Sequence, residues 1–212
     1  MAQAAGAAVA RLADEAIRWP AGGTCVAVYA AMAGELDAAP VAALARRHGA
    51  SICYPRVVDT RLGGDQRQDD PPLLTFHIVD GELAEGLRPG RFGIATPLTS
   101  APSATDIDIF FVPGLGFDAH GHRLGLGRGY YDAALRARPT ALRIGIGYDW
   151  QLVPAVPAEP HDELLDLVVT PRSCVVTKAR AAHPLCRSLS AGTAASDPTR
   201  SRPPSLGKEE PT

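Results

Sequence analysis

Residues 108–112 (DIFFV) constrain the fold most, because this short segment is almost continuously apolar. A strand with one solvated face alternates apolar and polar residues, whereas a strand buried on both faces reads as a continuous apolar run. The segment therefore predicts a strand over 106–113 at the centre of a sheet that is covered on both faces.

Strand-like and helix-like segments alternate along the chain. Strands are expected at 24–29, 51–54, 73–79, 106–113, 142–148 and 166–170, and helices at 5–18, 37–48 and 130–138. Such alternation is typical of parallel strands joined by helices. We predict a single three-layer α/β domain over 1–180, with a mostly parallel sheet and helices on both faces. Residues 59–72 predict a polar loop, and residues 181–212 a disordered tail rich in Ser and Pro.

Composition narrows the class of protein. The net charge of −2 and the pI near 6.3 argue against a general nucleic-acid-binding protein, which carries a basic surplus. The four cysteines are far apart and form no CxxC pair, which indicates a reducing, cytoplasmic setting. The N-terminal stretch has neither a signal-peptide pattern nor an apolar run of membrane-spanning length. The expectation is a soluble protein with no nucleic-acid or membrane partner.

The segment over 113–132, PGLGFDAHGHRLGLGRGYYD, is the strongest candidate for a ligand site. Gly125, Gly127 and Gly129 alternate in it, and the backbone N–H groups of such a loop can surround phosphate oxygens. Arg123 and Arg128 would add charge-assisted hydrogen bonds to the same oxygens. No Gly-Lys-Ser/Thr sequence closes the loop, so it is not a Walker loop. From the glycine spacing alone, a flexible surface turn is an equal alternative.

Five further residues are candidates around this loop. Asp132 and Asp162 offer carboxylates of the kind that magnesium takes together with phosphate oxygens and waters. From spacing alone, the more common role is a helix-start acid for Asp132 and a loop or capping residue for Asp162. Glu35 could accept hydrogen bonds from a substrate amine or remain solvated. Tyr130 and Tyr131 could stack on a flat ring or pack at the start of the helix.

Three blocks of the chain occur in an informative order: VAVYAAMAGELD at 26–37, FVPGLGFDAHGHRLGLGRGYYDAAL at 111–135, and IGIGYDWQLVPAVPAEPHDELLDLVVT at 144–170. They resemble the 5-formyltetrahydrofolate cyclo-ligase (methenyltetrahydrofolate synthetase) family. The resemblance implies an ATP- and magnesium-dependent closure of 5-formyltetrahydrofolate to 5,10-methenyltetrahydrofolate. ATP would phosphorylate the formyl oxygen, N10 would attack the activated carbon, and phosphate would leave. It also implies a small-molecule folate partner and a monomer.

The resemblance assigns roles residue by residue. Arg123 and Arg128 would serve catalysis, and Asp132 and Asp162 would hold Mg²⁺. The nucleotide contacts that it implies are Arg123, Leu124, Gly125, Leu126, Gly127, Arg128, Gly129, Tyr130 and Tyr131. The folate contacts are Glu35, Leu126, Gly127, Arg128, Gly129 and Tyr130.

Three features depart from the family pattern. Members usually begin with a basic Lys-x-x-x-Arg helix, whereas no lysine precedes Lys178 here, so that helix is expected to be missing, by evolution or through the choice of start. Arg128 stands where Gly or Lys is frequent, and Thr96 where Glu is common. Each charge-assisted contact to a phosphate is worth ~1.5–3 kcal/mol. The alternatives are therefore an impaired paralogue that binds a nucleotide or folate-like ligand, or an ATP-dependent ligase with another substrate.

Overall fold

The computed structural model describes residues 2–58, 73–79, 81, 86–90, 94–177 and 183–187. The helices are α1 (Ala2–Ala16), α2 (Ala39–Arg47) and α4 (Tyr130–Arg136), with the 3-10 turn η3 (Asp149–Gln151). The strands are β1 (Cys25–Ala27), β2 (Ser51–Val58), β3 (Leu73–Ile78), β4 (Leu87–Pro89), β5 (Ala95–Pro97), β6 (Ile109–Val112), β7 (Gly116–Phe117), β8 (Arg123–Leu124), β9 (Leu142–Ile146), β10 (Leu167–Val169) and β11 (Cys174–Val176).

One seven-stranded sheet organises the fold, in the order β11-β10-β9-β6-β1-β2-β3. The five inner strands pair in parallel, and β11 and β3 join antiparallel at the two edges. β6 lies between β9 and β1, and all of its residues are buried. The predicted mostly parallel sheet is confirmed, as is the central place of the apolar run.

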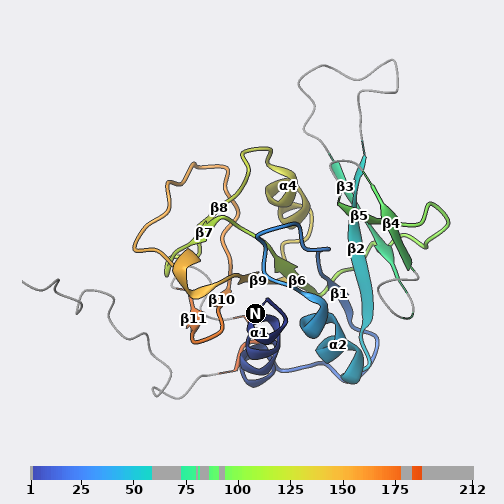
Figure 1. Cartoon of the computed structure of the whole chain (residues 1–212), viewed down its shortest axis with the longest axis horizontal. Coiled ribbons are helices and arrows are strands. Elements are labelled where there is room, and N and C mark those ends of the chain that lie inside the picture. Colours follow the sequence, from blue (N-terminus) through green and yellow to red (C-terminus); the bar gives the residue numbers. More distant parts are fainter. Residues whose placement is uncertain are drawn as a thin grey trace, which may run out of the picture.

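Helices cover both faces of this sheet, as predicted (Figure 1). Ile109 and Phe111 of β6 pack with α1 and α2 on one face. Phe110 and Val112 face the other way and pack with α4. The alternation follows from the strand geometry, since successive side chains point to opposite faces. None of the described helices is long and apolar enough to cross a membrane.

Strand β2 corrects one boundary, because it continues through Pro55 to Val58 instead of ending at that proline. β1 pairs only with the first three residues of β2, and β3 pairs with the rest. From Tyr54 onward β2 therefore has a single partner strand. A proline is tolerated there, because one side of the strand needs no N–H donor. The hairpins β4–β5 and β7–β8 were not expected from the sequence.

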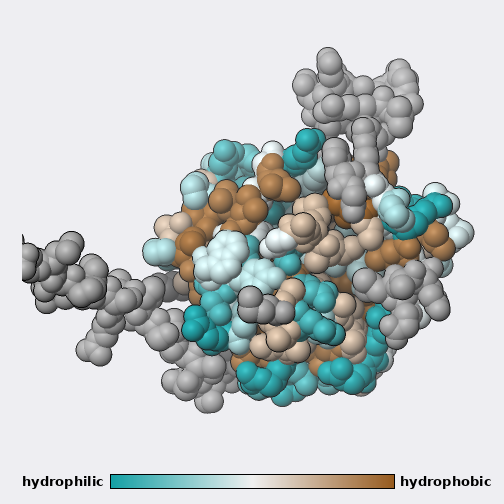
Figure 2. All heavy atoms as spheres, viewed as in Figure 1, coloured by the Kyte–Doolittle hydropathy of each residue, from teal (hydrophilic) through white to brown (hydrophobic). Residues whose placement is uncertain are grey.

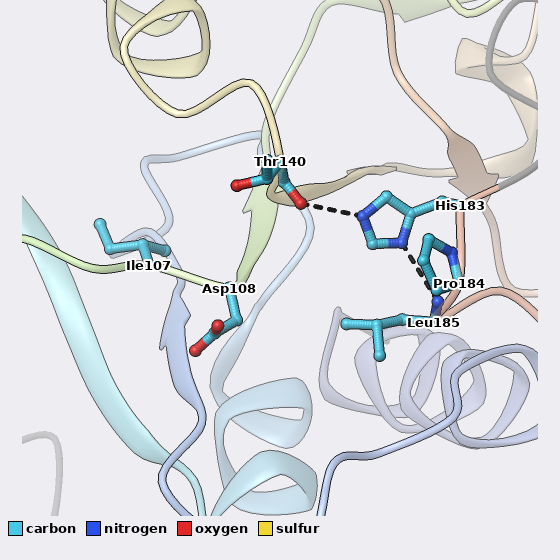
Figure 3. A pocket seen from close by; sticks show the side chains of 6 residues that line it. All are labelled: Ile107, Asp108, Thr140, His183, Pro184 and Leu185. Atoms are coloured by element: carbon cyan, nitrogen blue, oxygen red, sulfur yellow. Dashed lines mark hydrogen bonds between the residues drawn. The ribbon is translucent and has the colours of Figure 1, made fainter.

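The described segment 183–187 lies against the folded domain (Figure 3). Its backbone bonds to the end of α1, through Arg18 N–H to Leu185 O at 2.7 Å and Arg187 N–H to Ala16 O at 2.8 Å. The His183 ring bonds to Thr140 O through Nε2 (3.0 Å) and accepts from Leu185 N–H at Nδ1 (3.2 Å). The rest of the expected tail, residues 181–182 and 188–212, and the expected loop 59–72 lie outside the described residues.

Candidate active site

The glycine-rich loop, residues 125–129, lies between the β7–β8 hairpin and α4 (Figure 1). The hairpin follows the carboxyl end of β6, and Leu115 N–H closes it by donating to Leu124 O at 2.7 Å. In open parallel sheets, ligands bind beyond the carboxyl ends of the strands. The loop therefore occupies the position that a ligand loop needs. The described cavity of about 380 Å³ beside His183 lies instead before the start of β6 and β9, away from this loop.

Three glycines shape the loop in two different ways. Gly127 and Gly129 have φ values of +72° and +64°, and no atom lies within 4 Å of where a Cβ would stand. Their backbone is open on that side, and their conformation favours glycine. At Gly125 a Cβ would lie only 2.7 Å from Nη1 of Arg123. The guanidinium therefore packs directly against the loop backbone at this position.

Arg123 and Asp132 bind each other. Nη2 of Arg123 donates to both carboxylate oxygens at 3.1 Å, and the two side chains are only 7% and 17% exposed. The Arg123 guanidinium also lies 5.6 Å from the centroid of the Tyr131 ring. Charge-assisted pairs with low exposure hold their geometry well. The pair therefore fixes the start of α4 relative to β8, and holds the Arg123 guanidinium against the backbone of the loop.

Asp162 serves a local turn. Its Oδ2 accepts from Glu159 N–H at 2.7 Å, which is the capping role that the sequence left open. The next residue, Glu163, donates its N–H to Asp132 Oδ1 at 3.3 Å. The 159–163 turn thus adjoins the start of α4, and Asp162 is one residue from a direct contact with Asp132.

Glu35 reaches the same region from the loop after β1. Its Oε2 accepts from Met32 N–H at 2.8 Å, and its carbonyl oxygen accepts from Tyr148 Oη at 3.4 Å. Burial raises the pKa of Glu35, and the Met32 hydrogen bond only partly opposes that shift. Burial also raises the pKa of Tyr131, and the charge of Glu35 adds to that rise. The Tyr148 hydrogen bond therefore places half-buried Glu35 beside the segment that follows the carboxyl end of β9.

Comparison with known proteins shows the family to which the chain belongs. The sequence profile of the 5-formyltetrahydrofolate cyclo-ligase family matches residues 2–171. This chain belongs to that family. The 5-formyltetrahydrofolate cyclo-ligase of Escherichia coli K12 is 30% identical over 151 residues, which cover 69% of this chain and 77% of that protein. The enzyme of the same name from Mycolicibacterium smegmatis is 38% identical over 98 residues, but the chain spans only half of that protein.

The fold agrees with this membership. The solution structure of Aquifex aeolicus 5,10-methenyltetrahydrofolate synthetase superposes with a TM-score of 0.61, 24% identity, and coverage of 90% of this chain and 86% of that one. The corresponding protein from Mycoplasma pneumoniae gives a TM-score of 0.56 with 19% identity. At these identities the likeness shows the fold, and the cyclo-ligase fold is the α/β sheet described above.

The remaining predicted contacts differ in exposure. Leu124, Leu126 and Arg128 are exposed on the loop. Tyr130 and Tyr131 are half-buried and pack against the core beneath α4, which is the packing role that the sequence left open. Which of these residues contact nucleotide or folate stays a prediction for this family member.

Sequence reasoning missed the residue that organises the approach to the loop. Asp118 is 1% exposed, and its carboxylate accepts from the N–H groups of His120, His122 and Val156 and from His122 Nδ1, at 2.8–3.1 Å. Burial alone would raise the pKa of Asp118, but the hydrogen bonds outweigh it, so the pKa lies below its ordinary value. The sequence signal was an Asp three residues before Gly121, a pattern typical of a side-chain-capped turn.

A second missed group ties the site to the sheet. Glu163 binds Arg136 of α4 at 3.0 Å and Arg143 of β9 at 2.9 Å. Arg143 is almost fully buried and also donates to Leu135 O, while its backbone N–H donates to Asp166. The end of α4 is therefore held by Glu163 and Arg143, while Arg123 and the Glu163 N–H hold its start through Asp132, so that the helix behind the loop is supported at both ends.

Asp132 and Asp162 fit magnesium only if phosphate oxygens supply part of its coordination shell. The described part of the chain holds no group of three or more His, Cys, Asp or Glu side chains suited to a metal. Asp132 already accepts three hydrogen bonds, and a carboxylate offers about four acceptor positions. Magnesium needs only one or two carboxylates when phosphate oxygens and waters complete its shell. Asp132 fits that pattern, and Asp162 lies in the turn that contacts Asp132 through Glu163 N–H.

Proposed function

We propose that this chain closes 5-formyltetrahydrofolate to 5,10-methenyltetrahydrofolate, using ATP with magnesium. Family membership supports the reaction class. The observation that carries the proposal is that an open glycine loop, the Arg123–Asp132 pair and Glu35 all follow the carboxyl ends of parallel strands, at the same edge of the sheet. A phosphate-binding loop beside a carboxylate suited to a substrate amine is what a reaction of this class requires.

The proposed reaction has two steps, and each releases one leaving group. The formyl oxygen attacks the γ-phosphorus of ATP, ADP leaves, and the formyl carbon becomes electrophilic. N10 then attacks that carbon, the C–O bond breaks, inorganic phosphate leaves, and the N10 proton passes to solvent or a base. Phosphoryl transfer needs positioning and charge neutralisation more than covalent participation by the protein. No nucleophilic side chain is therefore required.

Arg123 has the geometry for charge neutralisation. One of its Nη groups is bound to Asp132, whereas Nη1 lies directly under Gly125. Since the pair fixes the guanidinium, its cation is oriented before a phosphate enters the loop. Preorganised charge of this kind stabilises developing negative charge without reorganisation. Exposed Arg128 would contact outer phosphate oxygens, and Asp132 with Asp162 would hold magnesium, which neutralises phosphate charge when bound.

Glu35 would hold the folate side of the site. Its carboxylate is half-buried and accepts from the Met32 backbone, so a substrate N–H would meet an acceptor that is partly shielded from water. Hydrogen bonds to partly desolvated carboxylates discriminate strongly between a substrate N–H and a group that lacks it. We propose a soluble, cytoplasmic monomer, consistent with the reducing setting that the four unpaired cysteines indicate.

The test is a spectrophotometric assay with 5-formyltetrahydrofolate, ATP and magnesium that follows the absorbance of the methenyl product. We expect ATP-dependent product from the unmodified chain. Asp132→Asn should lower kcat/KM about 100-fold, because it removes both a magnesium ligand and the partner of Arg123. The matched control is Asp106→Asn, an exposed aspartate in the loop before β6, which should change the rate less than twofold.

Two results would reject the proposal. The first is a folded chain that makes no methenyl product at any ATP concentration. The second is Asp132→Asn with the same rate as Asp106→Asn. If folded protein still binds ATP or 5-formyltetrahydrofolate in calorimetry without turnover, the chain is the impaired paralogue instead.

A further inference from the structure

The turn η3 is rigidly anchored beside the candidate site. Tyr148 N–H donates to Gln151 Oε1 at 2.7 Å, and Gln151 Nε2 donates to Gly114 O at 2.6 Å. Asp149 accepts from Thr170 Oγ1 at 2.8 Å and from the backbone N–H and Nε of Arg172 at 3.1 Å. Both ends of this short turn are therefore fixed to neighbouring segments, and the one side chain that it exposes starts from a fixed backbone.

That side chain is Trp150, which is 70% exposed. Its ring stacks against Tyr148, with centroids 6.1 Å apart and an interplanar angle of 10°. Tyr148 in turn donates its hydroxyl to the carbonyl oxygen of Glu35 at 3.4 Å. An indole combines a large apolar face with a polar N–H, which is why tryptophan is enriched at binding interfaces. The ring pair thus extends from the Glu35 side of the site toward solvent.

Exposed leucines continue this surface toward the glycine-rich loop. Leu115, Leu124 and Leu126 are all exposed, and Figure 2 shows apolar atoms gathered over β7 and β8. η3 is joined to the same hairpin, because Val153 N–H donates to Phe117 O at 2.8 Å. The apolar surface therefore runs from η3 across the hairpin to the loop, and borders the site along one side.

We propose that Trp150, backed by Tyr148, is an aromatic wall against which the planar ring system of the folate substrate stacks. This inference rests on the proposed function and names a specificity-determining residue for it. The ring pair adjoins Glu35, the expected folate contact, through the Tyr148 hydroxyl. Nearly parallel rings present a flat face, and a flat conjugated ligand buries more area on such a face than a flexible chain does. The apolar leucines fit the less polar part of the same ligand.

The chain contains two tryptophans, which makes the inference directly measurable. Trp19 lies between α1 and α2, where it stacks on His48. In the Trp19→Phe background, the remaining tryptophan fluorescence therefore reports Trp150 alone. We expect 5-formyltetrahydrofolate to quench it saturably and ATP alone to leave it unchanged. In the steady-state assay, Trp150→Ala should raise KM for the folate about tenfold with kcat within about twofold. Trp150→Phe, which keeps a flat ring, should recover most of that KM.

The outcomes separate this inference from the proposed function. Turnover without folate quenching, or Trp150→Ala with an unchanged KM, overturns the aromatic wall and leaves the reaction standing. Quenching by ATP alone overturns the aromatic wall as well, because the ligand ring that stacks on Trp150 would then be adenine. Folate quenching without turnover supports the wall and rejects the reaction. If the folded protein shows no quenching and no turnover, both the aromatic wall and the proposed reaction are rejected.

Discussion

The face covered by α1 and α2 and the end of the sheet that carries the candidate site are built on different principles. The α1–α2 face is packed mainly by alanine, valine, leucine and isoleucine side chains. In the site region, Asp118, Arg143, Gln151 and Asp166 are buried and hydrogen-bonded. Apolar packing is non-directional, whereas a buried hydrogen bond fixes both distance and angle. A site that positions phosphate and folate needs the second kind of order.

This difference predicts how each region responds to mutation. Apolar packing tolerates substitutions between apolar residues of similar volume, because the new side chain fills the same space. A buried polar group tolerates them poorly, because each lost partner leaves an unsatisfied atom away from water. Substitutions that remove polar contacts should therefore cost far more in the site region than on the helical face.

Asp118→Ala should give the largest effect on stability. It removes a buried carboxylate that accepts from three backbone N–H groups and His122 Nδ1, and it leaves the buried Val156 N–H without an acceptor, so we expect the free energy of unfolding to fall by about 3–5 kcal/mol. Urea unfolding at neutral pH measures the change. Asp106→Ala is the matched control, since that aspartate is exposed, and its effect should stay within about 0.5 kcal/mol.

The pH dependence of Asp118 sharpens this prediction. Its pKa is lowered in the folded state, so its charged form contributes stability above the ordinary pKa of 3.8, and that contribution is lost as pH falls through the folded pKa. The stability difference between the unmodified chain and Asp118→Asn should therefore shrink below pH 3.8. A difference that stays constant in this range would mean that the carboxylate is not the stabilising group.

Sequence and structure agree where burial can be inferred from a short local segment. The DIFFV run gave a central strand because burial on both faces depends only on local apolar content, and β6 holds that place. The antiparallel edge strands and the two hairpins depend on pairing between segments. The local pattern of apolar residues does not show which segments pair. The candidate site shows the same division. The loop was visible in its glycines, whereas the Arg123–Asp132 pair and the Asp118–Val156 contact arise only when separate segments meet.

Two glycines near the site should differ in their response to alanine. At Gly121, φ is +95° and a Cβ would lie 2.6 Å from Leu165 O, a backbone atom that cannot rotate away. Gly121→Ala should therefore cost about 2–3 kcal/mol of unfolding free energy. At Gly127, φ is +72° with no atom within 4 Å, so Gly127→Ala should cost only ~1 kcal/mol. Thermal unfolding of both variants measures the difference. Equal costs would show that the contact with Leu165, and hence the packing of the site loops on each other, is unimportant.

The smallest effect should come from the polar contact on the helical face. Asp14 Oδ1 accepts from Trp19 Nε1 at 3.0 Å and from His48 Nε2 at 2.8 Å, but both Asp14 and His48 are substantially exposed. Exposed pairs are worth little, because water competes for both partners. Asp14→Asn should lower the free energy of unfolding by less than ~1 kcal/mol in urea unfolding, and Glu15→Gln, which removes the still more exposed pair with Arg11, by less again. A loss above about 2 kcal/mol for Asp14→Asn would mean that α1 and α2 also depend on directional contacts. The two regions would then be stabilised in the same way, and the polar core of the site could no longer be attributed to its function.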